Sequence, residues 1–169
     1  MKNITIKSLL LCTLLTFSSC GIMVQGIAAG KISTEKGSMP PDFGKTKHVL
    51  LCKLKGKRGL DKYMKKHISN YYKGEVEFVT YQDLKENNKY SDKDKYRYVF
   101  ESKEHSNSGN YINSNGMPSA TSYISYSFGI FDRKALKNYS NDMSSGYFGK
   151  LIKAYAKKME EERLGSSEK

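Results

Sequence analysis

The sequence predicts an α/β (α+β) two-layer sandwich, with one mixed sheet, helices on one face and the element order β-α-β-β-β-α. Three observations predict it. Residues 48–81 contain an apolar run, an amphipathic helical pattern and a second strand pattern in succession, as in a βαβ unit. Two strand patterns follow at residues 96–101 and 121–132, and an amphipathic helical pattern closes the domain at residues 147–164. Such elements bury their apolar sides against each other in two layers.

The βαβ unit begins with residues 48–54, HVLLCKL, a short apolar run typical of a buried central strand. In residues 58–73 apolar side chains recur at helical spacing with lysines on the other face, and Gly74 follows as a helix-ending glycine. Residues 75–81, EVEFVTY, alternate as a half-buried strand does. The crossover of such a unit is right-handed in nearly all proteins, and the two strands are predicted to be parallel.

The next part of the chain is predicted to form an antiparallel pair of strands. Residues 82–95 are polar and charged, and we interpret them as a surface connection with a helical turn at residues 82–85. The strands at 96–101 and 121–132 are expected to pair across residues 102–118. This segment is rich in Ser, Asn and Gly, and is predicted to be a mobile loop.

An apolar stripe at helical spacing predicts the final helix at residues 147–164. The stripe consists of Phe148, Leu151, Ile152, Tyr155 and Met159. Ser144 or Ser145 is placed to cap the N-terminus of this helix. Residues 160–162 are all Glu and lie near the C-terminus, where the helix dipole favours cations, so this end is predicted to fray.

The N-terminus has the three parts of a secretory signal. Lys2 and Lys7 supply positive charge, residues 8–17 form an uncharged, mostly apolar run, and two serines precede Cys20. The sequence FSSCG at residues 17–21 resembles the lipid-attachment site of bacterial lipoproteins, of the Bacteroidetes type. Its Phe departs from the aliphatic residue usual at that position. The resemblance implies cleavage before Cys20, palmitate-type lipid on Cys20, and a protein anchored to a membrane of the cell envelope.

Two other interpretations of the N-terminus stay open. In one, the uncharged residues 8–30 are long enough to span a bilayer and form an uncleaved anchor. In the other, the small residues around Ala28 provide an ordinary cleavage site and the protein is released in soluble form. All interpretations place the body outside the cytoplasm. Residues 21–23 carry no acidic surface-export signal, which favours a periplasm-facing position.

The chain is accordingly predicted to have four parts. They are a signal peptide at 1–19, a lipid-anchored flexible tether at 20–46, a single α/β domain at 47–164 and a tail at 165–169. The tether assignment rests on Gly, Ser and Pro content with little periodicity. Cys12 leaves with the signal and Cys20 carries lipid, so Cys52 remains alone and no internal disulfide forms. Its apolar surroundings make Cys52 a small buried hydrophobic residue.

Charge narrows the set of partners. The chain carries 29 Lys and Arg against 17 Asp and Glu, a net charge of +12. Such a balance favours acidic partners, such as anionic phospholipid, lipopolysaccharide or acidic protein, or it simply makes a lysine-rich solubilising surface. The secretion signal argues against nucleic acid as a partner.

Patterns for nucleotide, metal and catalytic sites are incomplete. Gly44-Lys45-Thr46 has Met39 where a phosphate-binding loop needs its first glycine, and a strand rather than a helix follows it. His48, His67 and His105 are far apart and lack metal-ligand spacing. The acidic residues are scattered over lysine-rich polar stretches, and no GxSxG motif occurs. The sequence therefore predicts no nucleotide, no cofactor, no metal and no enzymatic activity.

Tyrosine is the more suggestive feature, because the chain has 13 Tyr and no Trp. Tyr96, Tyr98 and Tyr123 fall on predicted strands, and helices on one face would leave the other face of the sheet uncovered. These three tyrosines form a candidate binding face for protein or glycan, with half-buried packing as the alternative.

These observations predict a non-enzymatic binding or assembly module, held at an envelope membrane by its N-terminal lipid, with an envelope protein as candidate partner. The element order is similar, in topology alone, to accessory domains such as the N-terminal domain of the TolB family. A small envelope hydrolase acting on glycan or peptide is the first alternative, which requires two close carboxylates or Cys52 beside a histidine. An anionic-lipid or polyanion-binding protein is the second.

Replacing the attachment cysteine tests the anchor. In Cys20→Ala the thiol that would carry the lipid is gone, so the protein is expected to leave the membrane fraction or to stay unprocessed. Cell fractionation and the mass of the mature chain measure both effects, with Cys12→Ala as the matched control. Unchanged processing and membrane association in Cys20→Ala would contradict the lipoprotein assignment.

Overall fold

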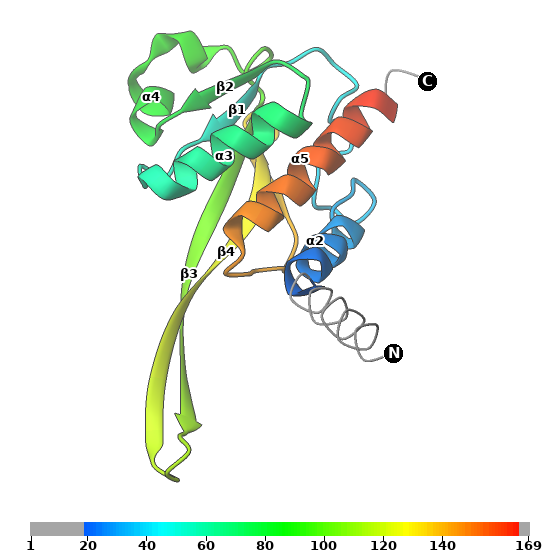
Figure 1. Ribbon diagram of the computed structural model, residues 1–169. Coiled ribbons are helices and arrows are strands. Elements are labelled where there is room, and N and C mark those ends of the chain that lie inside the picture. Colours follow the sequence, from blue (N-terminus) through cyan, green and yellow to red (C-terminus); the bar gives the residue numbers. More distant parts are fainter. Residues whose placement is uncertain (1–18, 166–169) are drawn as a thin grey trace, which may run out of the picture.

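The computed structural model describes residues 19–165, which form one mixed sheet with helices packed on it (Figure 1). The elements in chain order are α2 (Ser19–Lys31), β1 (Leu50–Lys53), α3 (Arg58–Tyr71), β2 (Val76–Val79), α4 (Tyr81–Glu86), the 3-10 helix η1 (Asn88–Ser91), β3 (Tyr98–Ile112), β4 (Pro118–Asp132), β5 (Lys137–Ser140) and α5 (Phe148–Gly165). The sheet order is β2-β1-β3-β4-β5; β2 and β3 run parallel to β1, and β4 is antiparallel to both β3 and β5. The predicted fold class is confirmed, as are the parallel βαβ unit and the closing helix.

The main core lies between the sheet and the layer of long helices α2, α3 and α5 (Figure 1). Side chains alternate along a strand, so Tyr98 and Phe100 of β3 face this core while Val99 faces the other side of the sheet. Phe100 stacks on Phe128 of β4 with ring centroids 5.5 Å apart. Tyr155 of α5 donates its hydroxyl to the carbonyl oxygen of Phe128 at 2.9 Å. The predicted apolar stripe of α5 is buried in full.

The flexible tether predicted at residues 20–46 is wrong for much of its length. The helix α2 lies beside α5. Four apolar side chains of the segment are buried in the main core: Ala28, Ile32, Met39 and Phe43. They are few and widely spaced among Gly, Ser and Pro, so no periodic pattern marks them in the sequence. Residues 1–18 of the predicted signal peptide and residues 166–169 of the predicted tail lie outside the described residues.

The mobile loop predicted at residues 102–118 is also wrong. The strands β3 and β4 continue past the body as a two-stranded ladder in unbroken register (Figure 1). Asn113 and Gly116, the latter with φ of +74°, close the turn. Beyond the body this ladder buries no face, so its sequence lacks the apolar alternation that marks a strand. We call residues 105–125 the hairpin arm.

The opposite face of the sheet is partly covered, so the connection predicted at residues 82–95 is more than surface. A smaller core forms there from Val49, Leu51, Val79, Tyr90, Tyr96 and Val99. The predicted helical turn is confirmed as α4, which supplies Leu84 to this core. The long helices share one face as predicted, and the short α4 and η1 are the exception.

Two further details differ from the prediction. The polar segment KNYS forms a fifth strand, β5, whose four residues are too few to show a pattern. The predicted fraying of α5 is wrong, because Glu160 accepts a hydrogen bond from the amide of Lys73 at 2.9 Å and pairs with Arg163 at 2.6 Å. These contacts hold the acidic end of the helix against the end of α3.

A cluster of charges joins three distant segments of the chain. Arg97, just before β3, donates from Nε and Nη2 to Asp132 at the end of β4, at 2.7 to 3.1 Å, and from Nη1 to Asp42 at 2.6 Å. The hydroxyl of Tyr98 donates to the other oxygen of Asp42 at 2.8 Å. Burial raises the pKa of Asp132, but hydrogen bonds from Arg97 and from two backbone amides of the following turn outweigh it, and this pKa lies below its usual range.

Removing one carboxylate of this cluster is expected to destabilise the fold. In Asp132→Asn the guanidinium of Arg97 keeps one charged partner instead of two, and the free energy of unfolding is expected to fall by about 3 kcal/mol. Asp94→Asn is the matched control, because Asp94 forms an ion pair with Lys134 but its side chain is 80% exposed. That variant is expected to lose less than about 0.5 kcal/mol in urea denaturation.

The lowered pKa of Asp132 also predicts how the stability of the protein depends on pH. The pKa of Asp132 is lower in the folded than in the unfolded chain, so its contribution to stability is present above about pH 4 and is lost as the pH falls through the folded-state pKa. The free energy of unfolding, measured in urea, should therefore fall more steeply with decreasing pH for the wild type than for Asp132→Asn. Parallel pH profiles for the two proteins would contradict this role of Asp132.

Candidate functional site

The three tyrosines predicted as a binding face are not brought together. Tyr96 and Tyr98 are 2% and 0% exposed, whereas Tyr123 is 60% exposed. The hydroxyl of Tyr98 donates to Asp42 beside the main core, and that of Tyr96 points to Glu77 beside the smaller core. Residues two apart on one strand have side chains on the same face of the sheet. Tyr96, however, lies in a turn, and β3 begins only at Tyr98. The predicted face is therefore wrong, and its exposed member, Tyr123, belongs to the hairpin arm.

Cys20 lies in the first turn of α2. Its lipidation stays a prediction that the fold does not test. Within residues 19–165, no helix combines the length and the apolar character needed to cross a bilayer.

The hairpin arm has two open edges. The pairing of β1 with β3 reaches Phe100, and β5 pairs with β4 from Gly129 onward. A single bridge between Ser145 and Tyr126 is the last backbone pairing before the arm. In the described part of the chain, no other backbone pairs with residues 105–125, so each strand of the arm presents a free edge.

The bridge at Tyr126 identifies which peptide groups of the arm face outward. Tyr126 exchanges both backbone hydrogen bonds with Ser145, each at 3.0 Å, so its N–H and C=O point away from β3. Outward groups recur at every second residue of an antiparallel ladder. On the β3 edge the outward residues are Ser106, Ser108, Asn110 and Ile112 of the arm, together with Glu104 just before it. The β4 edge is shorter, because Pro118 has no N–H and Tyr126 is already bridged.

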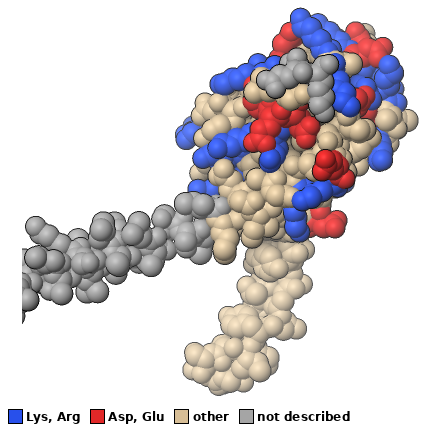
Figure 2. Space-filling view, turned by 90° about the vertical axis from the view of Figure 1, so that its right-hand side faces the viewer, with Lys and Arg blue, Asp and Glu red and all other residues tan. Residues whose placement is uncertain are grey.

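The arm is uncharged, whereas the body is densely charged. Figure 2 shows the arm in tan below a body covered with Lys, Arg, Asp and Glu. None of these four residue types occurs from His105 to Ser125. Large apolar side chains are exposed along the arm: Tyr111, Ile112, Met117, Tyr123 and Ile124. Open edges are usually protected by Lys, Pro or a bulge, and the β3 edge of the arm carries no such protection.

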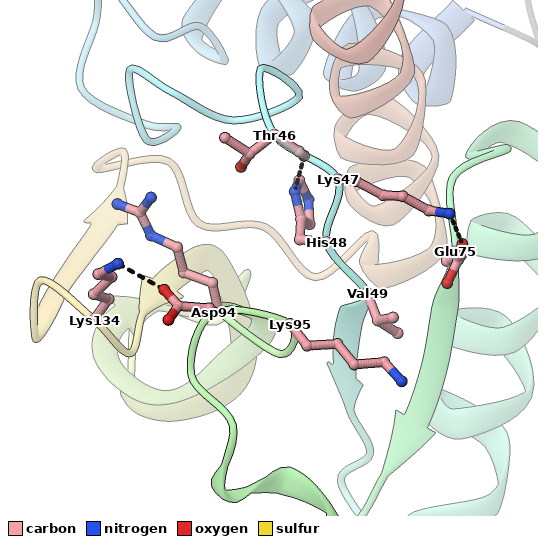
Figure 3. A pocket seen from close by; sticks show the side chains of 9 residues that line it. Thr46, Lys47, His48, Val49, Glu75, Asp94, Lys95 and Lys134 are labelled. Atoms are coloured by element: carbon pink, nitrogen blue, oxygen red, sulfur yellow. Dashed lines mark hydrogen bonds and ion pairs between the residues drawn. The ribbon is translucent and has the colours of Figure 1, made fainter.

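A pocket of about 610 Å³ is the second candidate (Figure 3). It lies at the N-terminal ends of β1 and β3, and four of its lining residues are cations: Lys47, Lys95, Arg97 and Lys134. Lys47 pairs with Glu75 at 3.5 Å and Lys134 with Asp94 at 2.6 Å, while Arg97 is bound to two aspartates. Three of the four cations are thus compensated from within the fold, so the pocket has little charge left for a ligand.

His48 beside this pocket has a structural role. Its Nδ1 lies 2.8 Å from the carbonyl oxygen of Thr46, and since a carbonyl oxygen can only accept, Nδ1 carries the proton. The ring is 8% exposed and packs between Phe43 and Tyr98, with centroids 5.2 and 4.7 Å away. Burial lowers the pKa of His48, so the ring is neutral at pH 7 and fixes the loop before β1.

Other reactive groups offer little chemistry. Cys52 is confirmed as a small buried residue, and burial raises the pKa of its thiol far above the ordinary value. Among residues 19–165, no three His, Cys, Asp or Glu side chains lie close enough together to hold a metal ion. No family model, no curated protein and no solved structure matches this chain. The fold and the site therefore define an α+β domain that carries a projecting β-hairpin arm.

The arm is expected to be separable from the fold of the body. None of the residues 106–124 is buried, so replacing them by Asn-Gly joins the opposed His105 and Ser125 through a two-residue turn without opening the core. The free energy of unfolding in urea is expected to change by less than about 1 kcal/mol. Loss of the cooperative transition in this armless variant would show that the body needs the arm.

Proposed function

We propose that the protein is a non-enzymatic assembly module of the bacterial cell envelope, anchored through Cys20, whose hairpin arm pairs with that of a second copy. The open β3 edge carries this proposal: four of its five outward residues are uncharged, and the fifth, Glu104, lies at the base of the arm and pairs with Lys57. The five outward-facing residues offer peptide groups to another strand, and the armless variant serves as the negative control.

Pairing with a further strand would stabilise the arm. An isolated two-stranded hairpin is marginally stable in water, whereas three or more strands with a shared apolar face are stable. Tyr111 and Tyr123 occupy one face of the ladder, and Ile112 and Ile124 the other. A second hairpin would extend the ladder to four strands and would continue both faces. The Tyr, Ser, Asn and Gly content of the arm is also that of binding loops in antibodies.

The second copy is favoured by symmetry and by charge. Antiparallel pairing of two β3 edges about Ser108 uses all five outward residues, with Ser106 opposite Asn110 and Glu104 opposite Ile112 of the other chain. Like charges directly opposite each other destabilise a pair of strands. In this register no two like charges are opposite each other. Two bodies of the same positive charge repel, and contact through the arms keeps them apart.

Two close carboxylates were the requirement for the alternative of a hydrolase. Asp42 and Asp132 do lie close together, but both bind Arg97, and the pKa of each carboxyl lies below its usual range. A general acid must instead hold its proton near neutral pH. The geometry therefore supports an assembly role better than a hydrolytic one.

Crosslinking tests the proposed pairing directly. In Ser108→Cys the new thiols of two copies meet at the symmetry axis, so a short bis-maleimide is expected to give a covalent dimer in membranes of intact cells. Ser122→Cys is the matched control, because Ser122 lies opposite Ser108 in the ladder but faces the other edge. The native Cys52 is buried and does not compete.

A second variant removes the hydrogen bonds. Ser108→Pro deletes an outward N–H without touching the pairing inside the hairpin, and the dimer dissociation constant in detergent is expected to rise at least about tenfold. Sedimentation equilibrium measures it, with Ser122→Pro as the control of unchanged affinity. A wild-type chain that stays monomeric at sedimentation equilibrium, or equal crosslinking at positions 108 and 122, would overturn the proposal.

A further inference from the structure

We infer that the groove between α3 and the first turn of α5 binds a small anion carried on a sugar ring, such as a sugar phosphate. The groove has a volume of about 600 Å³, within the range of small-molecule sites. Its walls include Tyr63 and His67 of α3 and the N-terminal part of α5 from Phe148 to Lys153. This site lies on the body and is independent of the arm.

The groove is lined by cationic side chains, and no carboxylate lines it to neutralise them. Lys66, Lys150 and Lys153 line it, and none of its lining residues is Asp or Glu. Within the described residues these three lysines form no ion pair, although Lys153 Nζ lies 5.3 Å from the ring centre of Tyr71. Burial and then the charges of the three lysines lower the pKa of His67, which reports a positive field at its ring. In the pocket of Figure 3, by contrast, carboxylates neutralise most of the lysines.

The start of α5 adds the positive end of a helix dipole to this groove. The helix dipole favours an anion at this N-terminus. The amides of Phe148 and Lys150 already donate to the carbonyl oxygens of Gly146 and Tyr147, each at 3.0 Å, which leaves the amide of Gly149 without a backbone partner among the described residues. The first turn of this 18-residue helix has no acidic side chain. Gly149 lets this turn approach α3, because a Cβ on it would lie 3.2 Å from Tyr63 Cδ1 and 3.4 Å from His67 Nε2. The groove lysines and the positive end of the α5 dipole therefore act on the same space.

Aromatic rings supply the wall for the apolar part of the ligand. Tyr63 and Tyr147 are 51% and 53% exposed at the groove, unlike most rings of the body. Tyr63 stacks on His67 with an interplanar angle of 6°, and Tyr126 meets Phe148 edge-on at 4.9 Å. The C–H face of a sugar ring packs on such rings, while a phosphate or carboxylate on the same sugar reaches the lysines.

Binding of glucose 6-phosphate to the ¹⁵N-labelled full chain in detergent micelles tests the site, with glucose and inorganic phosphate as partial probes. Glucose 6-phosphate is expected to shift the amide resonances of Gly149 and Lys150, and to bind at least about tenfold more tightly than either partial probe. Equal binding of inorganic phosphate would overturn the sugar part of the inference. No shift in the groove with glucose 6-phosphate would overturn the site itself.

A pair of double variants separates the site from general attraction to a basic protein. Lys150→Gln with Lys153→Gln is expected to weaken glucose 6-phosphate binding about tenfold, through the loss of two groove charges. Lys62→Gln with Lys93→Gln removes the same total charge from exposed positions outside the groove and is expected to leave binding within about twofold. Equal weakening by the two double variants would overturn the inference.

Discussion

The contact of Arg97 with two aspartates is the constraint on which the arrangement of the chain depends. It ties the segment before β1, the start of β3 and the end of β4 to one guanidinium. Buried ion pairs add little net stability over apolar packing, but an unpaired buried charge is costly, so arrangements that separate these three segments are disfavoured. Arg97 therefore acts mainly by specifying one arrangement, in which the N-terminal segment closes the core.

The register of the hairpin arm is set at the buried end of the β3–β4 ladder, next to Arg97. Tyr98 is opposite Asp132, and Phe100 and Phe128 are buried and stacked nearby. A slip of one residue would turn these rings out of the core, so the buried half of the ladder admits a single register. The arm has no apolar core of its own and takes its register from the same two strands. The body thus acts as a template that holds an otherwise marginal hairpin extended.

The sequence predicted the parts of the fold in which apolar periodicity and burial coincide. The βαβ unit and α5 show such periodicity, and both were located within a few residues. Most of the arm was missed because strands without a buried face show no apolar alternation, and its Ser, Asn and Gly are typical of loops; residues 121–125 alone fell within a predicted strand. Ala28 and Phe43 were missed because single apolar residues reach the core from a segment without a pattern. Tyr96 was misplaced because a turn, rather than a strand, sets its direction. The arm itself had one signal in the sequence, the absence of charge between His105 and Ser125 in a strongly basic chain.

The length of the arm is explained if the bodies must stay apart. At physiological salt, exposed charges act over roughly 8 Å, so two bodies of this net charge repel only at close range. In the proposed pairing Glu104 of one chain lies opposite Ile112 of the other. The two Glu104 residues are then eight residues apart along the ladder, roughly 26 Å at about 3.3 Å per residue, which is well outside that range. Anchoring in one bilayer would then raise the effective concentration of the arms and allow weak strand pairing to suffice. Charged bodies, a neutral arm and a lipid anchor are thus mutually consistent requirements for copies that join along their arms.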